Sequence, residues 1–360
     1  PSSQKNYNIE PSISTSYEIG TEFRLFNNRL WGDFNYYTRD DKDQIISVTS
    51  APQSGYSTRK MNAGLIRNRG VELSLGGMPV STKNWKWEMN FNIAKNSNKL
   101  VELADGVDSY SIYWTSFTTR LYNYAMVGKS LGVITGNTWE RDDNGNIIFH
   151  ELSASQKALY GGEYVPTYNQ NTLDELGNFH PDFTGGFNTS ISFKNFRLSA
   201  NIDFSVGGQI VSYTNMWGSS SGILDKTAEL NDRGVNVREP VSKGGGIHMT
   251  GVDQDGNKVD TYVNAKLYYT TASRVWEEWV YDRTYVKLRE VSLSYVFPSQ
   301  TLKKLNIGLS RASVAINASN PWLIYSACPN VDVSEIGMGY FEGGNAAATR
   351  SIGFTVNLAF

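Results

Sequence analysis

The end of the chain carries the pattern that most restricts the fold. From residue 352 to residue 360, one alternate set of residues is small or polar and the other is apolar, namely Ile352, Phe354, Val356, Leu358 and Phe360. Successive side chains of a β-strand point to opposite faces, so this segment predicts a strand with one apolar and one polar side. Such a strand, ending in an aromatic residue, suits the closing strand of a membrane β-barrel. It also fits the last strand of a sandwich, whose apolar face lies in a core.

Composition favours a large β protein. Aromatic residues make up 13% of the chain, which also has 33 glycines and only 10 prolines. No stretch reaches the roughly 18 consecutive apolar residues that a spanning helix needs, so strands would have to cross any membrane. The mean hydropathy of -0.39 does not decide the matter, because only alternate residues of a barrel strand face lipid. The periodicity of apolar residues is therefore the more informative property.

Charge and the scarcity of metal ligands argue against several classes of function. The 33 basic and 35 acidic residues leave a net charge of -2, which gives no field to attract nucleic acid. One cysteine, Cys328, and three scattered histidines, His150, His180 and His248, predict neither a disulfide framework nor a metal site. Cys328 is expected to be a small packed side chain rather than a nucleophile. We expect no nucleic-acid partner, no cofactor and no metal.

The alternation recurs along the chain. Residues 16–25 alternate and end in a polar turn, which predicts a hairpin with residues 30–39. Residues 85–94 alternate over about the 9 to 11 residues that a tilted strand needs to cross a bilayer. Residues 187–206 predict a second hairpin, with charged residues on one face only. The pattern predicts sheet, but a soluble sandwich would show the same alternation.

The predicted connections differ in length. Short turns are expected at 27–29, 78–84, 194–195 and 298–304, and long irregular stretches at about 97–121, 141–181 and 212–281. Short turns at one end and long loops at the other are typical of an outer-membrane β-barrel whose long loops face outside. A compact soluble domain rarely has several structureless loops longer than about 15 residues. Loop length therefore favours the barrel.

Five blocks of sequence follow one pattern in order. They are Ser16-Tyr17-Glu18-Ile19-Gly20 with Arg29-Leu30, Tyr36-Tyr37 and Asp43-Gln44-Ile45-Ile46; Asn62-Ala63-Gly64 with Ile66 and Asn68-Arg69-Gly70-Val71-Glu72-Leu73; Pro181-Asp182-Phe183-Thr184-Gly185-Gly186-Phe187 with Gly207-Gly208; Asp282 to Val291 with Tyr295-Val296-Phe297-Pro298; and Asn317-Ala318-Ser319-Asn320-Pro321-Trp322. In these blocks the chain resembles the SusC/RagA-type TonB-dependent transporters of Bacteroidetes. The resemblance covers nearly the whole chain outside the three long loops.

The resemblance implies an all-β fold, an antiparallel transmembrane β-barrel with long extracellular loops. Residues 1–360 would form its C-terminal part, with roughly 10–12 strands of an expected 22, about the number found in large outer-membrane transporters. Nothing matches the family's signal peptide, plug or first strands, and the chain opens on the polar run Pro1-Ser2-Ser3. We therefore expect a processed chain or a piece of a longer one, because an open half-sheet in lipid leaves unpaired groups that cost several kcal/mol each.

The resemblance also implies a function. Members import nutrients through the outer membrane, energised by TonB and working with a SusD-like surface lipoprotein, and no bond in the cargo is made or broken. Expected partners are thus TonB, a SusD-like lipoprotein, the N-terminal half of the same transporter and membrane lipid. The cargo would be an oligosaccharide or a peptide, and the sequence leaves both open. No enzyme activity is expected.

Aromatic residues in the long loops are the candidate cargo contacts, namely Tyr110, Tyr113, Trp114 and Trp217. Aromatic faces stack on sugar rings or pack against peptide side chains. Such residues more often pack loops together or against a partner, and this second interpretation stays open for each of them. The apolar residues of the C-terminal strand, Ile352, Phe354, Val356, Leu358 and Phe360, are predicted to close the barrel.

Three further motifs have an ordinary structural explanation. Residues 142–146 and 253–257 read DDNGN and DQDGN, which supply oxygens of the kind that calcium loops use. Neither run ends in the glutamate that an EF-hand loop requires, so tight hairpin turns are the better prediction. Residues 276–279 read WEEW and are predicted to lie in a strand, where adjacent carboxylates point to opposite faces and cannot act on one bond.

The alternative from another class is a soluble surface β protein that binds glycans. Its support is the abundance of aromatic residues, with 9 Trp and 21 Tyr. The ordered blocks, the unequal loops and the terminal Phe360 favour the transporter. An outer-membrane hydrolase has no support, since none of the three histidines falls in a predicted strand.

Overall fold

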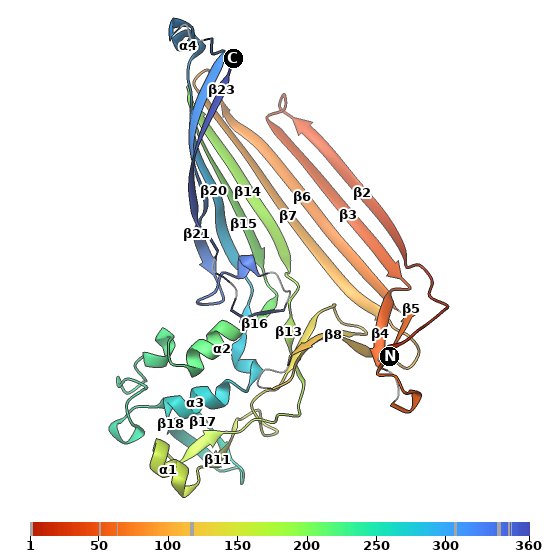
Figure 1. Cartoon of the computed structure of the whole chain (residues 1–360), viewed down its shortest axis with the longest axis vertical. Helices are drawn as coiled ribbons and strands as arrows, with labels where there is room; N and C mark the ends of the chain where they lie inside the picture. Colours follow the sequence, from red (N-terminus) through yellow and green to blue (C-terminus); the bar gives the residue numbers. More distant parts are fainter. Residues whose placement is uncertain are drawn as a thin grey trace.

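The computed structural model describes residues 3–49, 52–62, 64–115, 119–305, 308–336, 340–344, 346 and 348–360. A long sheet of nine strands forms one part of the molecule, and a lobe of loops, short strands and helices lies at one end of it (Figure 1). The strands of the sheet follow one another in chain order, and all neighbours are antiparallel. They are β2 (Ile13–Leu25), β3 (Leu30–Lys42), β6 (Leu65–Ser81), β7 (Trp85–Glu102), β14 (Phe183–Phe193), β15 (Phe196–Val206), β20 (Tyr285–Val296), β21 (Arg311–Ser326) and β23 (Ser351–Ala359).

The predicted antiparallel all-β fold is confirmed, with fewer strands in the main sheet than expected. Within the described residues this sheet has nine strands, where the sequence predicted roughly 10–12. Further strands lie in the connections and pair with one another instead of extending the sheet. These are β1 (Ser3–Gln4), β5 (Thr58–Asn62) and β4 (Ile45–Thr49); β13 (Asp174–Asn178), β10 (Val133–Gly136), β9 (Leu121–Met126) and β8 (Ser109–Thr115); β12 (Tyr164–Pro166), β11 (Ile148–Glu151), β17 (Ile247–Asp253) and β18 (Lys258–Val263); and β19 (Val280–Asp282), β16 (Gln209–Ser212) and β22 (Phe341–Glu342).

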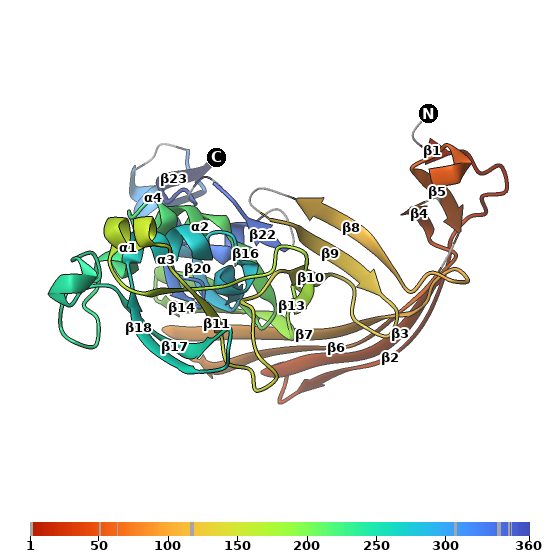
Figure 2. The same ribbon diagram turned by 90° about the horizontal axis from the view of Figure 1, so that it is seen from below.

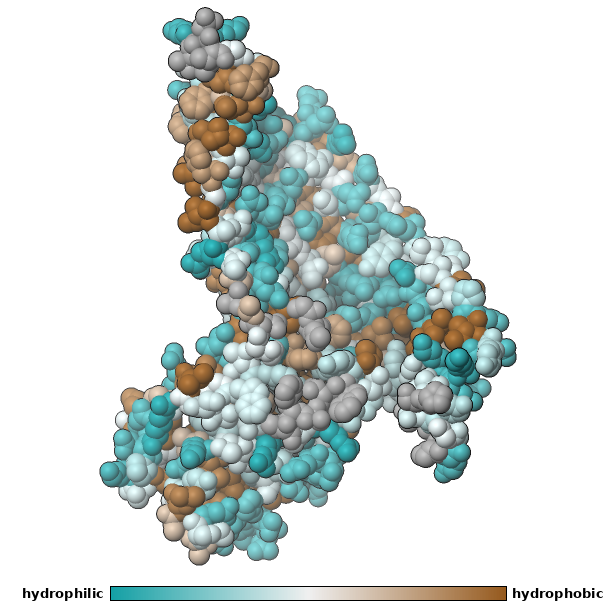
Figure 3. Space-filling view, in the orientation of Figure 1, coloured by the Kyte–Doolittle hydropathy of each residue, from teal (hydrophilic) through white to brown (hydrophobic). Residues whose placement is uncertain are grey.

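The two faces of the main sheet differ in polarity. The register aligns an apolar row across five strands, which consists of Phe354, Ile316, Leu293, Leu198 and Ile191. The adjacent row on the opposite face consists of Gly353, Asn317, Ser292, Ser199 and Ser190. The sheet is curved, and the lobe lies over its concave side (Figure 2). Side chains along β21 and β23 at the edge of the space-filling view are mostly apolar, whereas the face turned to the viewer is mostly polar (Figure 3).

Aromatic residues border the apolar, convex face at the end where the turns are short. Trp85 lies 4.3 Å from Phe193 between ring centroids, and Phe196 lies 4.7 Å from Tyr295. On β7 the apolar residues continue to Ile93. From Trp85 to Ile93 the strand covers roughly 27 Å at about 3.4 Å per residue, and a tilt of about 40° reduces this to roughly 21 Å. The height is close to the apolar band of about 25 Å that a membrane β-barrel exposes.

The connections alternate between short and long, as predicted. The short ones are 26–29, 82–84, 194–195 and 297–310, and the C-terminus lies at the same end of the sheet (Figure 1). In the first turn, Asn27 and Asn28 take φ values of 54° and 62°, a left-handed conformation that asparagine tolerates better than most residues. Two predicted turns have different bounds, because β6 continues to Ser81 past a bulge and 298–304 falls largely within the helix α4 (Ser299–Leu305).

The long connections are 43–64, 103–182, 207–284 and 327–350. The sequence predicted irregular stretches in the second and third of these, but both contain strands and helices. Besides the small sheets the long connections contain α1 (Ala154–Tyr160), α2 (Tyr213–Ser220), α3 (Ala265–Ala272) and the 3-10 helices η1 (Pro52–Ser54), η2 (Asp225–Ala228), η3 (Val241–Lys243), η4 (Trp276–Trp279) and η5 (Val333–Glu335). Among the described helices, none has the length and apolarity that crossing a membrane requires. Strand β7 also runs to Glu102, into the first stretch predicted as loop.

An aromatic core explains why these connections fold. Trp276 and Trp279 are 0% and 1% exposed, and they belong to a buried cluster that also contains Leu121, Ile134, Trp139, Val211, Tyr213, Met216, Val237, Ala265, Tyr269, Ala272, Val275 and Tyr340. These residues come from the long connections 103–182 and 207–284, with Tyr340 from 327–350. Removing this much apolar surface from water offsets the entropy of ordering long loops.

Candidate functional site

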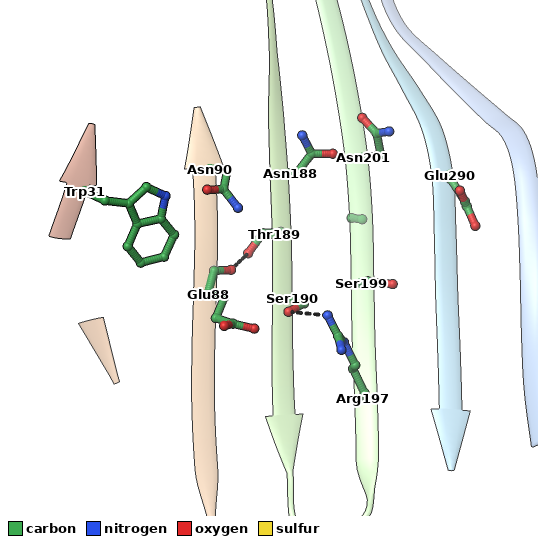
Figure 4. A pocket seen from close by; sticks show the side chains of 11 residues that line it. Trp31, Glu88, Asn90, Asn188, Thr189, Ser190, Arg197, Ser199, Asn201 and Glu290 are labelled. Carbon is green, nitrogen blue, oxygen red and sulfur yellow. Dashed lines mark hydrogen bonds between the residues drawn. The ribbon is translucent and has the colours of Figure 1, made fainter. Parts of the chain in front are cut away.

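The concave face of the sheet presents a wall of polar side chains around a cavity of about 360 Å³. Its lining comes from five strands and comprises Trp31, Glu88, Asn90, Asn188, Thr189, Ser190, Arg197, Ser199, Ala200, Asn201 and Glu290 (Figure 4). The Trp31 indole lies over Gly76, where an added Cβ would be 1.9 Å from the indole Nε1. Glycine at this position thus lets a large aromatic side chain lie flat against the sheet.

Several polar groups of this wall are available to a ligand. Arg197 donates a 3.2 Å hydrogen bond to Ser190 Oγ, and Lys86 is 2.8 Å from Glu88. Within the described part of the chain, the side chains of Asn188, Asn201 and Glu290 have no hydrogen-bond partner. A carboxamide can donate to and accept from hydroxyl or amide groups, and a carboxylate accepts from hydroxyl, amide or ammonium groups. The wall is thus suited to polar cargo and has no arrangement that points to bond cleavage.

The last long connection is fixed to this wall by an ion network near the lobe. The Lys287 side chain, only 2% exposed, donates to Asp332 Oδ2 and Glu335 Oε1, both at 2.7 Å. Arg289 donates to both oxygens of Asp203 at 2.8 and 2.9 Å and also contacts Glu335. Because Lys287, Arg289 and Asp203 lie on strands of the sheet, the network holds η5 against the concave face.

The network lowers the pKa values of two carboxyl groups in the last long connection, Asp332 and Glu335. Burial alone would raise the pKa of Asp332, but hydrogen bonds from Lys287 and Ser334 outweigh it and hold the pKa below its usual value. The hydrogen bond from Lys287, together with Arg289, likewise lowers the pKa of Glu335. Both groups are therefore charged at neutral pH, as the ion pairs require.

A second buried network joins the same connection to helix α2. Glu342 is 1% exposed and accepts hydrogen bonds from Thr214 N at 2.9 Å, from Thr214 Oγ1 at 2.7 Å and from Ser212 Oγ. Its charge lies at the N-terminus of α2, which favours an anion. Cys328 is buried beside this network, and burial raises the pKa of its thiol to about 12. The thiol is therefore protonated and packed, as the sequence predicted.

The prediction of a strand at residues 276–279 is wrong, because these residues form η4. A 3-10 turn brings both glutamates toward the segment around Trp139. Glu278 accepts from Trp139 Nε1 at 2.6 Å, and Glu277 accepts from Trp139 N at 3.0 Å and from Arg141 at 2.7 Å. The hydrogen bonds that Arg141 donates to Glu277 raise the pKa of Arg141. Both carboxylates are thus occupied in holding two long connections together, which agrees with the predicted structural role.

Both aspartate-rich motifs form tight turns. Asp142 Oδ1 accepts from the backbone N–H groups of Asn144 and Asn146 at 2.9 and 2.8 Å, and Asp253 Oδ1 accepts from the equivalent groups at the same distances. Hydrogen bonds from Asn146 and Asn257 lower the pKa values of the two aspartates. Among the described residues no cluster of His, Cys, Asp and Glu is arranged to hold a metal ion. The two motifs lie beside the paired strands β11 and β17.

The structure describes the side chains of three of the four aromatic candidates, and these lie in different surroundings. Tyr110 packs against the cluster around Ile46, and burial raises its pKa. Tyr113 is 45% exposed, with its ring 5.8 Å from Tyr340 and 6.0 Å from Phe341. Trp114 lies in β8, but its side chain is outside the described residues. Trp217 is 44% exposed on α2. Their roles in binding cargo remain predictions.

The aromatic neighbours of Tyr113, which are Tyr340 and Phe341, could not be identified from the sequence. Phe341 lies 5.1 Å from Tyr213, so a row of rings runs from exposed Tyr113 into the core. Tyr340 is buried, and its hydroxyl has no hydrogen-bond partner among the described residues. The signal in the sequence was the aromatic pair directly before Glu342-Gly343-Gly344. The polar wall was also missed, although its residues occupy the polar positions of the predicted strands.

The comparison with known proteins decides the family. Residues 1–209 match the model described as "TonB dependent receptor-like, beta-barrel", which is more than half of the chain. The chain belongs to this family. The TonB-dependent receptors are outer-membrane β-barrels and are transporters rather than enzymes. The convex apolar face of this receptor chain is accordingly its lipid-facing surface.

Individual relatives agree with this assignment. TonB-dependent receptor P3 of Formosa agariphila is 28% identical over 335 residues, covering 91% of this chain and 31% of that protein. TonB-dependent receptor SusC of Bacteroides thetaiotaomicron is 30% identical over 214 residues, covering 57% of this chain and 20% of that protein. The chain spans about a third of the length of receptor P3 and less of SusC.

The solved structures of the RagAB peptide importer share the fold. Its "closed-closed" state superimposes with a TM-score of 0.70 at 18% identity, covering 97% of this chain and 35% of that one. The "open-open" state gives a TM-score of 0.69 with 96% and 34% coverage. The receptor-type sheet and the loops at its end therefore correspond to those of a known transporter barrel.

Proposed function

We propose that this chain is the C-terminal barrel part, residues 1–360, of a transporter that imports oligosaccharide or peptide nutrients through the outer membrane. The observation that carries the proposal is the family match over residues 1–209, on strands whose convex face is apolar at membrane height. TonB would energise transport through a plug on another part of the same protein, and a SusD-like lipoprotein would act at the surface.

The open edges of the sheet support the need for further strands. Strands β2 and β23 each have a sheet neighbour on one side only within the described residues. In lipid, every unpaired backbone group costs several kcal/mol, so these edges require strand partners. The first strands of the transporter, together with β23 as the closing strand, would complete the barrel.

The polar wall and the exposed Tyr113 ring support a polar cargo of the glycan or peptide class. Sugar hydroxyls and peptide amides both suit the unpaired groups of Asn188, Asn201 and Glu290, and both can pack on an aromatic face. Among the relatives, RagAB is described as a peptide importer. The alternative of a soluble glycan-binding protein conflicts with the convex face, which would expose rows of apolar side chains to water.

Co-purification tests the proposal. Native outer membranes are extracted in mild detergent, the protein is captured through a tag at the C-terminal side of Phe360, and everything that travels with it is identified by mass spectrometry. We expect peptides from a plug and earlier barrel strands and a SusD-like lipoprotein. A transporter without any co-purifying lipoprotein would contradict the proposed partnership, and recovery of these 360 residues alone from the soluble fraction would overturn the transporter.

A further inference from the structure

A group of basic residues lies on the convex face where the apolar rows end toward the lobe. Lys42 is on β3, and Arg67 and Arg69 are on β6. The register aligns Arg69 with Thr38 and Tyr17, and Arg67 with Asp40 and Thr15. The row before them contains Ile19, Tyr36 and Val71, which belongs to the apolar face. The cations therefore sit directly above the membrane band rather than in the lumen.

These basic residues share a recess of about 400 Å³. It is lined by Thr15, Tyr17, Thr38, Asp40, Lys42, Arg67 and Arg69. Two threonine hydroxyls and one phenol can donate hydrogen bonds to an anion in the recess, beside the cationic groups. Tyr17 and Tyr36 are large exposed side chains at this height, and tyrosine is typical of the boundary between membrane and water.

The recess has more positive than negative charge. Its one acidic residue, Asp40, is fully engaged by Arg67, which donates to both carboxylate oxygens at 2.7 Å. Lys42 and Arg69 are exposed. Within the described residues neither forms a salt bridge, although both act electrostatically on Asp40. Lys99 is aligned with Arg67 on the same face and adds a further exposed cation. The group therefore has an excess of positive charge that a second anion can balance.

We propose that this recess binds the phosphate of an anionic lipid in the leaflet on the lobe side of the membrane. Lys42 and Arg69 hold the phosphate, Thr15 and Thr38 donate to its oxygens, and the acyl chains lie along Ile19 and Val71 below. A lipid fits better than a free anion, because the recess opens directly onto the apolar band and a lipid fills both. The site goes beyond the proposed transport and is independent of the cargo.

Native mass spectrometry of the complete, delipidated transporter in detergent tests the site. The probes are dioleoyl phosphatidic acid, dioleoyl phosphatidylcholine and inorganic phosphate. The variant is Lys42→Gln with Arg69→Gln, and the charge-matched control is Lys258→Gln with Lys266→Gln, two exposed lysines of the lobe. A cation near an anionic lipid surface contributes roughly fivefold in affinity. We expect the variant to bind phosphatidic acid about thirtyfold more weakly and the control to stay within about twofold.

A conservative variant, a folding control and comparisons among the three probes complete the test of the lipid site. The conservative variant Lys42→Arg with Arg69→Lys should keep most of the affinity, and heat-modifiable gel migration should show that all variants form barrels. Equal binding of phosphatidic acid by variant and control would overturn the proposal. If the unmodified transporter bound phosphatidylcholine as tightly as phosphatidic acid, recognition of an anionic headgroup would be overturned. Displacement of the lipid by an equal concentration of inorganic phosphate would show a free-anion site and overturn the lipid site.

Discussion

The main sheet and the lobe reach order by different means. In the sheet, side chains alternate between lipid and lumen, and backbone hydrogen bonds between consecutive strands carry the structure. In the lobe, an aromatic core and hydrogen bonds such as that from Trp139 to Glu278 hold together segments that are far apart in the sequence. The sheet is therefore sensitive to which face a residue occupies, and the lobe is sensitive to the shape of single large side chains.

Removing a core tryptophan should give the largest difference in stability between the lobe and the main sheet. Trp279→Ala should destabilise the lobe by about 3–5 kcal/mol, the range for large aromatic truncations, and leave the barrel folded. Hydrogen exchange of segments 207–284 measures the lobe, and heat-modifiable migration measures the barrel. Trp217→Ala, at an exposed position of the same lobe, is the control and should have little effect. Loss of the barrel in Trp279→Ala would show that the regions do not fold independently.

Introducing charge should test the faces of the sheet. Val291→Arg places a cation on the lipid side, near the middle of the band, and should cost about 2–4 kcal/mol. Ser292→Arg, one residue further, places it on the lumen side and should cost less than about 1 kcal/mol. Urea unfolding of the reconstituted transporter gives both values. Equal costs would mean that the two faces have been assigned incorrectly.

Two conservative changes sharpen the description of the lobe. Trp279 donates from Nε1 to Ala272 O at 2.8 Å and has Lys226 4.3 Å from its ring. The indole Nε1–H of Trp276 is buried without a partner among the described residues. Trp279→Phe should therefore cost about 1–2 kcal/mol more than Trp276→Phe, since only the first loses a hydrogen bond and weakens a cation–π contact. Thermal unfolding of the lobe, followed by tryptophan fluorescence, compares them, and the reverse order would contradict the contacts.

The ion network predicts a smaller, pH-dependent effect at the junction of lobe and sheet. The folded-state pKa values of Asp332 and Glu335 are lowered, so their contribution to stability is full above the ordinary carboxyl pKa of about 4 and is lost as pH falls through the lowered values. Amide protection of residues 327–336, corrected for intrinsic rates, should fall below about pH 4. Lys287→Met should remove most of this dependence, and an unchanged profile would exclude the network as its cause.

The sequence predicts the sheet better than the lobe for a physical reason. Alternation in residues 16–25, 85–94 and 187–206 is local, and each predicted strand is present in the structure. The fold of residues 276–279 depends on partners such as Trp139 and Arg141, which lie more than a hundred residues away in the chain. No local pattern indicates such a contact, so the sequence predicts a strand where the structure has a 3-10 turn.

The residues of the candidate site also divide into those that a local pattern predicts and those that depend on contacts between distant segments. The polar wall could have been found from the polar positions of the strands, because its residues other than Thr189 and Ala200 share one face by register. The contacts of Tyr113 with Tyr340 and Phe341 depend on the folding of two loops and could not. Aromatic content alone therefore identified the kind of residue but not its neighbours.

The exposure of side chains along β7 to lipid and to water is the most direct test of a lipid-facing convex surface. Single nitroxide labels are placed from Trp85 to Lys99 in the reconstituted transporter, and their exposure to oxygen and to a water-soluble nickel chelate is measured; the native Cys328 is buried and should not react. We expect a period of two, with odd positions from Trp85 to Ile93 exposed to lipid, even positions exposed to water, and both sets exposed to water from Lys95 onward. Water exposure of the odd positions throughout, or no alternation, would contradict a lipid-facing convex surface.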